Sequence, residues 1–193
     1  MITPGPATVA AARDAFGELP RGIHHLGVTV PDIEAASAFL REAVGARWCY
    51  DGLTRDDPPR DGPLVERQLG LPEGARIVRQ RMMRIGNGPG LELFEIETPS
   101  RQPAAALQDF GLNHMAVYCD DMDAAVERMR AAGGDLLSEV HGNSRHEDSP
   151  GNASVYARAP WGMLIELQSI PGGYYYDDAS EATAWLPQRR GQE

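Results

Sequence analysis

Two histidines and two glutamates recur at matching places in this chain of 193 residues. His25 lies in the segment Gly-Ile-His-His-Leu-Gly-Val, and His114, 89 positions later, lies in Gly-Leu-Asn-His-Met-Ala-Val. Each copy also closes on an acidic, strand-like segment, in which Glu92 and Glu166 each stand between two aliphatic residues. Imidazole nitrogens and carboxylate oxygens are ligands of divalent transition metals. If the two copies meet at one seam, these four side chains are enough to hold a divalent metal ion.

Alternation along the strands decides which of these side chains share a face. In each first strand the apolar residues alternate with the histidine, and in the last strand of the second copy they alternate with the glutamate. The apolar face is expected to meet a helix, so His25, His114 and Glu166 point to the opposite face. His24 and Asn113 immediately precede the two histidines and lie on the helix side or at its margin, which makes them poorer ligand candidates.

Glu92 has two competitors in the segment Leu-Glu-Leu-Phe-Glu-Ile-Glu. The match between the two acidic segments selects Glu92, and strand alternation puts Glu95 and Glu97 on the other face. An alternative without metal stays open, because two hydrogen-bonded His–Glu pairs would satisfy each other. A glutamate among strand leucines is costly to desolvate without a positive partner. Since both copies carry the full set, we favour the metal.

Module one is predicted to begin with a strand over residues 23–30. Asp32 is a good N-cap for the next segment, in which apolar residues keep helical spacing until Gly45 ends it. Residues 51–74 are rich in Asp, Pro, Gly and Arg, which predicts an inserted loop. Further strands are expected to start at 48–50 and to cover 76–85 and 91–97.

Module two repeats this order. A strand over 112–119 precedes an N-cap at Asp120 or Asp121, and the helix that follows ends at Gly133 and Gly134. The remaining strands are expected at 136–140, 153–158 and 163–169.

The domain prediction is one compact domain built from both modules. Its parts are an N-terminal lead-in at 1–20, module one at 21–100 with the loop 51–74, module two at 110–171, and a C-terminal tail at 172–193.

Composition excludes some function classes. A formal net charge of −10 disfavours nucleic acid, which needs clustered Lys and Arg. No apolar run approaches the ~20 residues that span a bilayer, and no secretory signal is visible, so we expect a cytoplasmic protein. Cys49 and Cys119 lack a paired spacing, and Cys119 is expected to pack as a small apolar residue.

Several other polar and aromatic residues have a weaker claim to function. The arginines along one strand and the two histidines of a polar loop are expected to be a solvated face and an ordinary loop, and the aromatic tail is expected to pack over the body or a neighbouring subunit. These residues are Arg79, Arg81 and Arg84; His141 and His146; and Tyr174, Tyr175, Tyr176 and Trp185.

At these positions the chain resembles the vicinal oxygen chelate superfamily, which includes glyoxalase I, methylmalonyl-CoA epimerase, extradiol dioxygenases and bleomycin- or fosfomycin-resistance proteins. The resemblance covers about residues 22–170. Four motifs carry it: His-His-Leu-Gly-Val-Thr-Val-Pro-Asp at 24–32, Gly-Leu-Glu-Leu-Phe-Glu at 90–95, Asn-His-Met-Ala-Val at 113–117, and Pro-Trp-Gly-Met-Leu-Ile-Glu-Leu at 160–167.

The resemblance implies an α+β fold, in which two tandem βαβββ modules form a U-shaped, partly closed β-sheet cup. It also implies that His25, Glu92, His114 and Glu166 hold one divalent ion, which could be Ni, Co, Mn, Zn or Fe. The expected enzyme is an isomerase or lyase of the glyoxalase or epimerase type. It would remove a proton next to a carbonyl of a small-molecule substrate and stabilise an enediolate, with Glu166 as base and Glu92 on the opposite face.

Two alternative functions stay open at this point. An Fe(II) dioxygenase would use the same cup, although a fourth protein ligand at Glu92 argues against it. A non-catalytic binding or resistance protein would use Trp161, Tyr118 and Phe94 to stack on a ligand. The metal centre could form within one chain or across a homodimer. The 15 additional positions of module one fall in the loop 51–74 and are expected to shape the substrate site.

Overall fold

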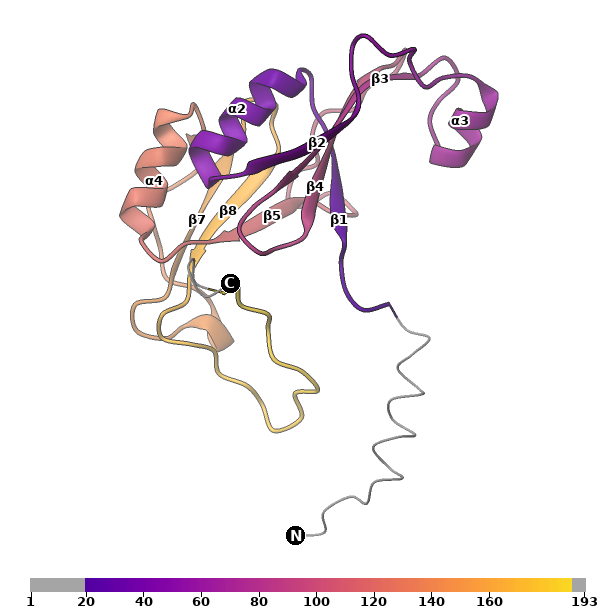
Figure 1. The fold of residues 1–193 in the computed structure, drawn as a ribbon. Coiled ribbons are helices and arrows are strands. Elements are labelled where there is room, and N and C mark those ends of the chain that lie inside the picture. The colour runs from indigo at the N-terminus through magenta and orange to yellow at the C-terminus, as the bar shows by residue number, and fades with distance from the viewer. Residues whose placement is uncertain (1–19, 189–193) are drawn as a thin grey trace, which may run out of the picture.

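The computed structural model describes residues 20–188, which form two βαβββ modules (Figure 1). The lead-in predicted at 1–20 lies almost wholly outside these described residues, as do the last five residues of the tail. Module one consists of β1 (His25–Thr29), α2 (Ile33–Val44), β2 (Arg47–Leu53), α3 (Pro63–Leu69), β3 (Arg76–Arg84) and β4 (Gly90–Glu97). Module two consists of β5 (His114–Tyr118), α4 (Met122–Ala131), β6 (Asp135–Leu136), the short 3-10 helix η1 (Arg145–Glu147), β7 (Ala153–Arg158) and β8 (Leu164–Ser169).

Each module contributes a four-stranded mixed sheet, with strand order β1-β4-β3-β2 in the first and β5-β8-β7-β6 in the second. The first strand of each module pairs in parallel with the last, and the other pairs are antiparallel. The α+β class with two repeated modules is therefore confirmed. Within the described chain the two sheets stay separate and do not close into a barrel.

Both long helices begin where the sequence predicts, and α2 also ends there, whereas α4 ends at Ala131, just before the predicted Gly133. Asp32 Oδ1 accepts a hydrogen bond from Ala35 N at 2.9 Å, and Gly45 ends α2 in the left-handed conformation, with φ of 69°. In module two, Asp121 plays the same part by accepting from Ala124 N at 2.9 Å. Cap chemistry thus fixes the direction in which each helix leaves its first strand.

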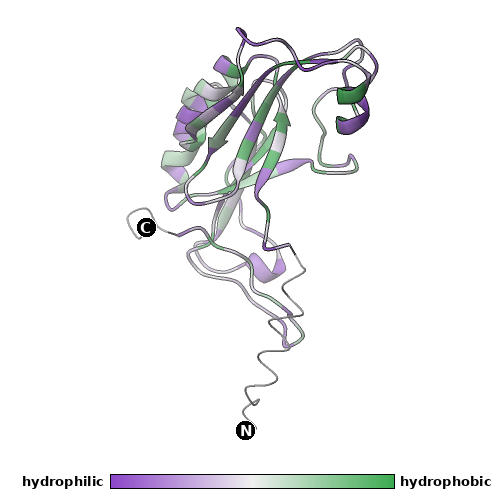
Figure 2. Ribbon diagram, turned by 45° about the vertical axis from the view of Figure 1, so that its right-hand side comes forward, coloured by the Kyte–Doolittle hydropathy of each residue, from purple (hydrophilic) through white to green (hydrophobic). Residues whose placement is uncertain are grey.

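The hydrophobic core joins the two modules through their helices. Helices α2 and α4 lie side by side (Figure 1), and residues of both belong to one buried cluster with the central strands. Phe39 of α2 packs edge to face on Trp161 of module two, with ring centroids 5.4 Å apart. In Figure 2 the strands are largely coloured as hydrophobic, whereas the paired helices also carry hydrophilic segments. The helix-covered faces of both sheets therefore meet in the interior of the chain.

The predicted loop at 51–74 is partly wrong, because it contains the end of β2 and the helix α3. This helix has only seven residues, and it begins with a proline after Gly62 and ends at Gly70 in the left-handed conformation. It lies apart from the paired helices (Figure 1) and has no buried residue. Pro63 and Gly70 mark its two ends, but α3 has neither a side-chain cap nor the buried apolar face whose spacing identifies a helix in a sequence.

The predicted strand at 136–140 is also too long, since β6 ends at Leu136. Among residues 20–188, no helix is both long and apolar enough to cross a lipid bilayer.

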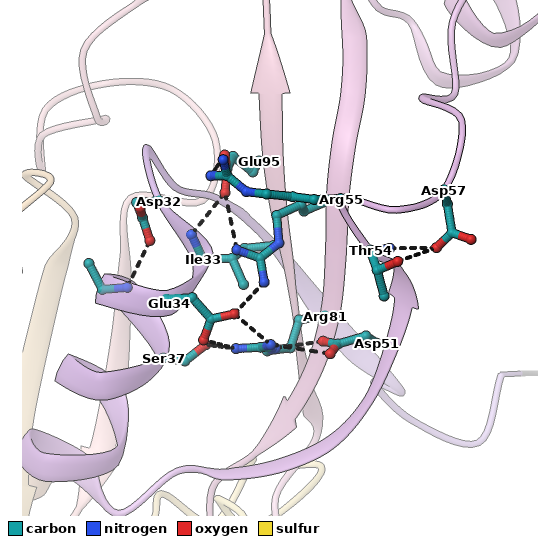
Figure 3. Close-up of polar contacts among 12 residues, drawn as sticks. Asp32, Ile33, Glu34, Ser37, Asp51, Thr54, Arg55, Asp57, Arg81 and Glu95 are labelled. Carbon is teal, nitrogen blue, oxygen red and sulfur yellow. Dashed lines mark hydrogen bonds and ion pairs between the residues drawn. The ribbon is translucent and has the colours of Figure 1, made fainter.

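Arg79 and Arg81 of β3 do not form the solvated face expected from the sequence, and they do not lie on the face of His25. Arg84, which shares its register partner Gly90 with His25, is exposed as expected. Arg81 is only 8% exposed and lies beneath α2. Its guanidinium donates to Asp51 at 2.6 and 3.2 Å, to Glu34 at 2.9 and 3.0 Å, and to Ser37 at 3.1 Å (Figure 3). Arg79 joins the same network through Glu34. This network fastens α2 to the sheet.

We predict that Arg81→Met lowers the free energy of unfolding by about 1–2 kcal/mol, because Asp51 loses its partner, whereas Glu34, whose side chain is 61% exposed, is largely screened by water. The pKa of Glu34 is lowered to about 2 by its hydrogen bonds with Arg81 and Arg79, and the pKa of Asp51 is also lowered, first by Arg81. A lowered pKa adds stability above the unfolded value, and this stability is lost as pH falls from about 4.5 to about 2. Urea titrations across this range measure both effects.

The matched control is Arg84→Met, at an exposed position of the same strand. It should leave the free energy of unfolding within about 0.5 kcal/mol of that of the unchanged protein. The interpretation is wrong if Arg81→Met is as stable as this control or keeps the full acid sensitivity.

Candidate metal centre

The first half of the candidate centre is the pair His25 and Glu92. They lie on the neighbouring parallel strands β1 and β4, where Gly27 pairs with Glu92 in the register. His25 Nε2 lies 3.2 Å from Glu92 Oε2, and the side chains are 39% and 18% exposed. Gly90, the register partner of His25, leaves room for both Met82 and His25, because a Cβ there would lie 2.7 Å from Met82 Sδ and 3.3 Å from the Cβ of His25. Strand pairing and a missing side chain thus position this pair.

The second half repeats this arrangement in module two. His114 Nε2 lies 3.4 Å from Glu166 Oε2, with side chains 29% and 12% exposed. Ala116 of β5 pairs with Glu166 of β8, as Gly27 pairs with Glu92 in module one. The sequence repeat is therefore also a repeat of side-chain geometry.

The residues that precede the two histidines orient them. His24 Nδ1 lies 2.8 Å from His25 Nδ1, and Asn113 Oδ1 lies 2.6 Å from His114 Nδ1. The sequence argument set His24 and Asn113 aside as poor ligands and missed this role, although their matching positions were the available signal. Partners on the second ring nitrogen are a common feature of metal-binding histidines, because they fix the ring and its tautomer.

Strand alternation separates Glu92 from its competitors. Glu95 faces α2, where its Oε2 accepts a hydrogen bond from Ile33 N at 3.1 Å, and it pairs with Arg55 at 3.0 Å (Figure 3). Glu97 pairs with Arg76 at 3.0 Å. Both acids therefore have structural partners away from the histidine, whereas Glu92 faces His25 and accepts a hydrogen bond from Gln80 Nε2.

The donor atoms fit a divalent ion. Ligands about 2.0–2.2 Å from an ion in adjacent coordination positions lie about 3 Å apart, close to the two His–Glu separations. When His114 donates its Nδ1–H to Asn113, the neutral ring turns the Nε2 lone pair toward the carboxylate of Glu166. Two acceptors facing each other repel, and a cation between them removes the repulsion. The same distances also suit protonated imidazoles that donate to the carboxylates, which is the metal-free arrangement.

The described part of one chain does not bring the two pairs together. No group of three or more His, Cys, Asp or Glu side chains within residues 20–188 is placed to hold a metal ion. The structure thus contains two separate half-sites, His25 with Glu92 and His114 with Glu166. The packing of α2 against α4 accounts for this separation, because it turns the helix-covered faces of the sheets toward each other.

The aromatic residues considered as stacking groups divide between core and site face. Trp161 belongs to the interior through its contact with Phe39 and its packing on the buried cluster. Phe94 lies on the face that carries Glu92, where a Cβ on Gly27 would contact its ring at 3.5 Å. Core packing therefore explains the presence of Trp161 without a stacked ligand.

Paired βαβββ modules, each with its first and last strands parallel and adjacent, define the vicinal oxygen chelate fold. The chain belongs to the glyoxalase/bleomycin resistance protein/dioxygenase superfamily, whose family model matches residues 24–149. The match to the family model and the fold thus confirm the resemblance found in the four motifs.

Individual relatives include an enzyme named 2-epi-5-epi-valiolone epimerase from an Actinomyces species. It is 34% identical over 169 residues, which are 86% of this chain and 88% of the relative. Among solved structures, a glyoxalase family protein from Bacillus cereus matches with a TM-score of 0.62 and 20% identity, over 79% of this chain and 96% of the other. The fosfomycin resistance protein FosX from Listeria monocytogenes matches with a TM-score of 0.52 and 18% identity, over 78% and 94%. These two structures support the fold alone.

Proposed function

We propose that the protein is a metal-dependent epimerase that inverts a carbon next to the carbonyl of a polyhydroxylated cyclic ketone. The observation that carries this proposal is the pair of equivalent His–Glu half-sites, which supplies two carboxylates, each beside a histidine. The similarity to an enzyme named for the epimerisation of 2-epi-5-epi-valiolone supports the reaction type and suggests the substrate class.

His25, Glu92, His114 and Glu166 are the residues that would hold the ion. A bound divalent ion would act as a Lewis acid that stabilises negative charge on the substrate oxygen. The donor set of two imidazoles and two carboxylates suits Ni, Co, Mn, Zn or Fe.

The two glutamates divide the proton transfers. Glu166 would remove the proton from the carbon next to the carbonyl, and the protonated carboxyl group of Glu92 would deliver a proton to the opposite face of the same carbon. Exchange with solvent after product release would return the proton to Glu92 and take it from Glu166. An inversion of configuration needs an acid–base group on each side, which two equivalent carboxylates provide. Both side chains are more than four-fifths buried, so bulk water competes weakly for the transferred proton.

A second copy of the chain would complete each centre. Strands β1 and β5, which carry the two histidines, are edge strands of their sheets. Large apolar residues are exposed beside these strands, with Ile23 at 71%, Leu112 at 68% and Phe110 fully exposed. An isologous dimer could cover these residues and bring His25 and Glu92 of one subunit to His114 and Glu166 of the other.

The reaction is tested with 2-epi-5-epi-valiolone in D₂O, with the protein loaded in turn with each of the five metals. Proton NMR is expected to show deuterium entering at the carbon next to the carbonyl, together with the epimeric product. The same sample under anaerobic conditions should react equally fast. A reaction that consumes oxygen, or no exchange with any metal, would overturn the proposal.

The orienting role of Asn113 gives a further prediction. Asn113→Ala is expected to weaken metal binding by about 10- to 100-fold, because His114 loses the partner that fixes its ring. Competition with a chromophoric chelator measures the affinity. Asn143→Ala in the loop before η1 serves as control and should leave the affinity unchanged. Equal affinities of the two variants would remove Asn113 from the centre.

A further inference from the structure

The face of module two around Glu166 carries a second set of polar side chains that the proposed proton transfers do not use. Tyr156 of β7 is the register partner of Glu166, and its ring lies 5.4 Å from the ring of His114. Gln168 follows Glu166 by two positions and shares its face. Gln168 Nε2 donates to Glu147 Oε2 at 3.3 Å. A chain of contacts thus leads from the half-site to Glu147 at the end of η1.

The C-terminal segment is fastened directly beside Glu147. Tyr175 N donates to His146 O at 2.7 Å, and His146 Nδ1 lies 2.7 Å from Tyr175 O. The buried side chain of Asn152 donates to the carbonyls of Glu147 and Gly173, both at 2.9 Å. These contacts fix the backbone on both sides of residue 174 next to residue 147. We call these contacts of residues 146, 147 and 152 with residues 173 and 175 the clasp. His146 therefore has a structural role and does not belong to the ordinary polar loop expected from the sequence.

Tyr174 lies between the two backbone positions, Gly173 and Tyr175, that the clasp holds next to Glu147. The pKa of Tyr174 is raised, first by burial and then by the negative charge of Glu147, with smaller effects from Tyr176, Tyr118 and Glu166. The side chain is half-buried, whereas the next residue, Tyr175, is 57% exposed. Tyr174 therefore keeps its phenolic proton at neutral pH and can donate it to a ligand.

Module one has a less polar face at the equivalent place. Met82 and Phe94 stand beside Glu92 at the places that Tyr156 and Gln168 take beside Glu166, while Gln80, the register partner of Phe94, donates a hydrogen bond to Glu92. The proton-transfer groups are thus equivalent in the two modules, but the surrounding side chains are not. A substrate with one hydroxyl-rich edge would be oriented by this difference.

We propose that Glu147 and Tyr174 form a hydroxyl-binding subsite that holds the polyol edge of the substrate over module two. A carboxylate accepts and a phenol donates, so together they match a hydroxyl group, which does both. The inference rests on the proposed function for the identity of the substrate, but the subsite itself stands on the clasp and the contacts of Glu147. It makes the C-terminal segment a determinant of specificity.

The test compares Glu147→Gln and Tyr174→Phe with the matched control Tyr175→Phe. Each of the first two changes is expected to raise KM for 2-epi-5-epi-valiolone about tenfold and to leave kcat within about threefold, because binding and not proton transfer is affected. Tyr175→Phe should keep both constants within about twofold. A KM unchanged in both test variants would overturn the subsite.

A binding measurement separates this subsite from the proposed reaction. Saturation-transfer NMR with myo-inositol as probe is expected to give a signal with the unchanged protein and with Tyr175→Phe, and a signal at least halved in the two test variants. If the signal depends on both residues while no α-proton exchange occurs, the reaction is wrong and the subsite stands. If exchange occurs but neither KM nor the inositol signal responds to the variants, the subsite is wrong and the reaction stands. If the unchanged protein shows neither inositol signal nor exchange, both proposals fail.

Discussion

Glu166→Gln is expected to slow the exchange of the substrate's α-proton by about a thousandfold, which is within the range that a positioned general base contributes. The amide has nearly the same shape as the carboxylate but cannot accept the proton. Glu166 lies 3.4 Å from His114 and is 12% exposed, so water has little access to replace it. Deuterium incorporation followed by proton NMR measures the rate.

The matched control for this change is Glu127→Gln on α4, where the side chain is 76% exposed and pairs with Arg130 one turn away. It should react at the rate of the unchanged protein. Metal content is measured in parallel, because a loss of the ion in Glu166→Gln would assign the effect to binding. Exchange within tenfold of the control, with the ion retained, would show that another group removes the proton.

A mixture of two inactive variants is expected to recover activity if the centres form between subunits. Glu92→Gln damages only module one and Glu166→Gln only module two. In a mixed dimer, one centre then receives both damaged halves and the other receives two intact halves. With random pairing, half of the dimers are mixed and half of their centres work, so about a quarter of full activity returns. Co-expression with two different affinity tags allows the mixed dimer to be purified and assayed.

The control mixture combines His114→Ala with Glu166→Gln, which damage the same module. Every centre in that mixture has a damaged module-two half, so no recovery is expected. Centres formed within one chain predict no recovery in either mixture, and that outcome would contradict the dimer.

The sequence predicted those parts of the molecule that depend on local chemistry. Asp32 and Gly45 fix the ends of α2 through a side-chain hydrogen bond and a left-handed residue, both of which depend on residue type alone. Strand alternation separated Glu92 from Glu95 correctly, since only the latter faces α2. The register of the repeat also predicted that His114 occupies the place of His25.

The parts that the sequence did not predict depend on contacts between distant segments. In the sequence, Arg81 cannot be distinguished from an exposed strand arginine. Its partners Glu34 and Asp51 come from α2 and β2, and only the fold brings them to it. The clasp between His146 and Tyr175 joins residues 29 positions apart, with no motif in either segment. The packing of α2 on α4, which separates the half-sites within one chain, is likewise decided by which surfaces bury the most apolar area.

Each sheet ends on a strand that leaves one row of backbone amides and carbonyls unpaired, and in both sheets this strand carries the histidine. Edges of this kind invite a neighbouring chain. A neighbouring chain that docks there would satisfy these backbone groups. The same docking would bring its own histidine and glutamate to the half-site. The rate would then fall more steeply than linearly as the protein is diluted. Separated subunits would lose half of the metal ligands of each centre and would expose their edge strands to water.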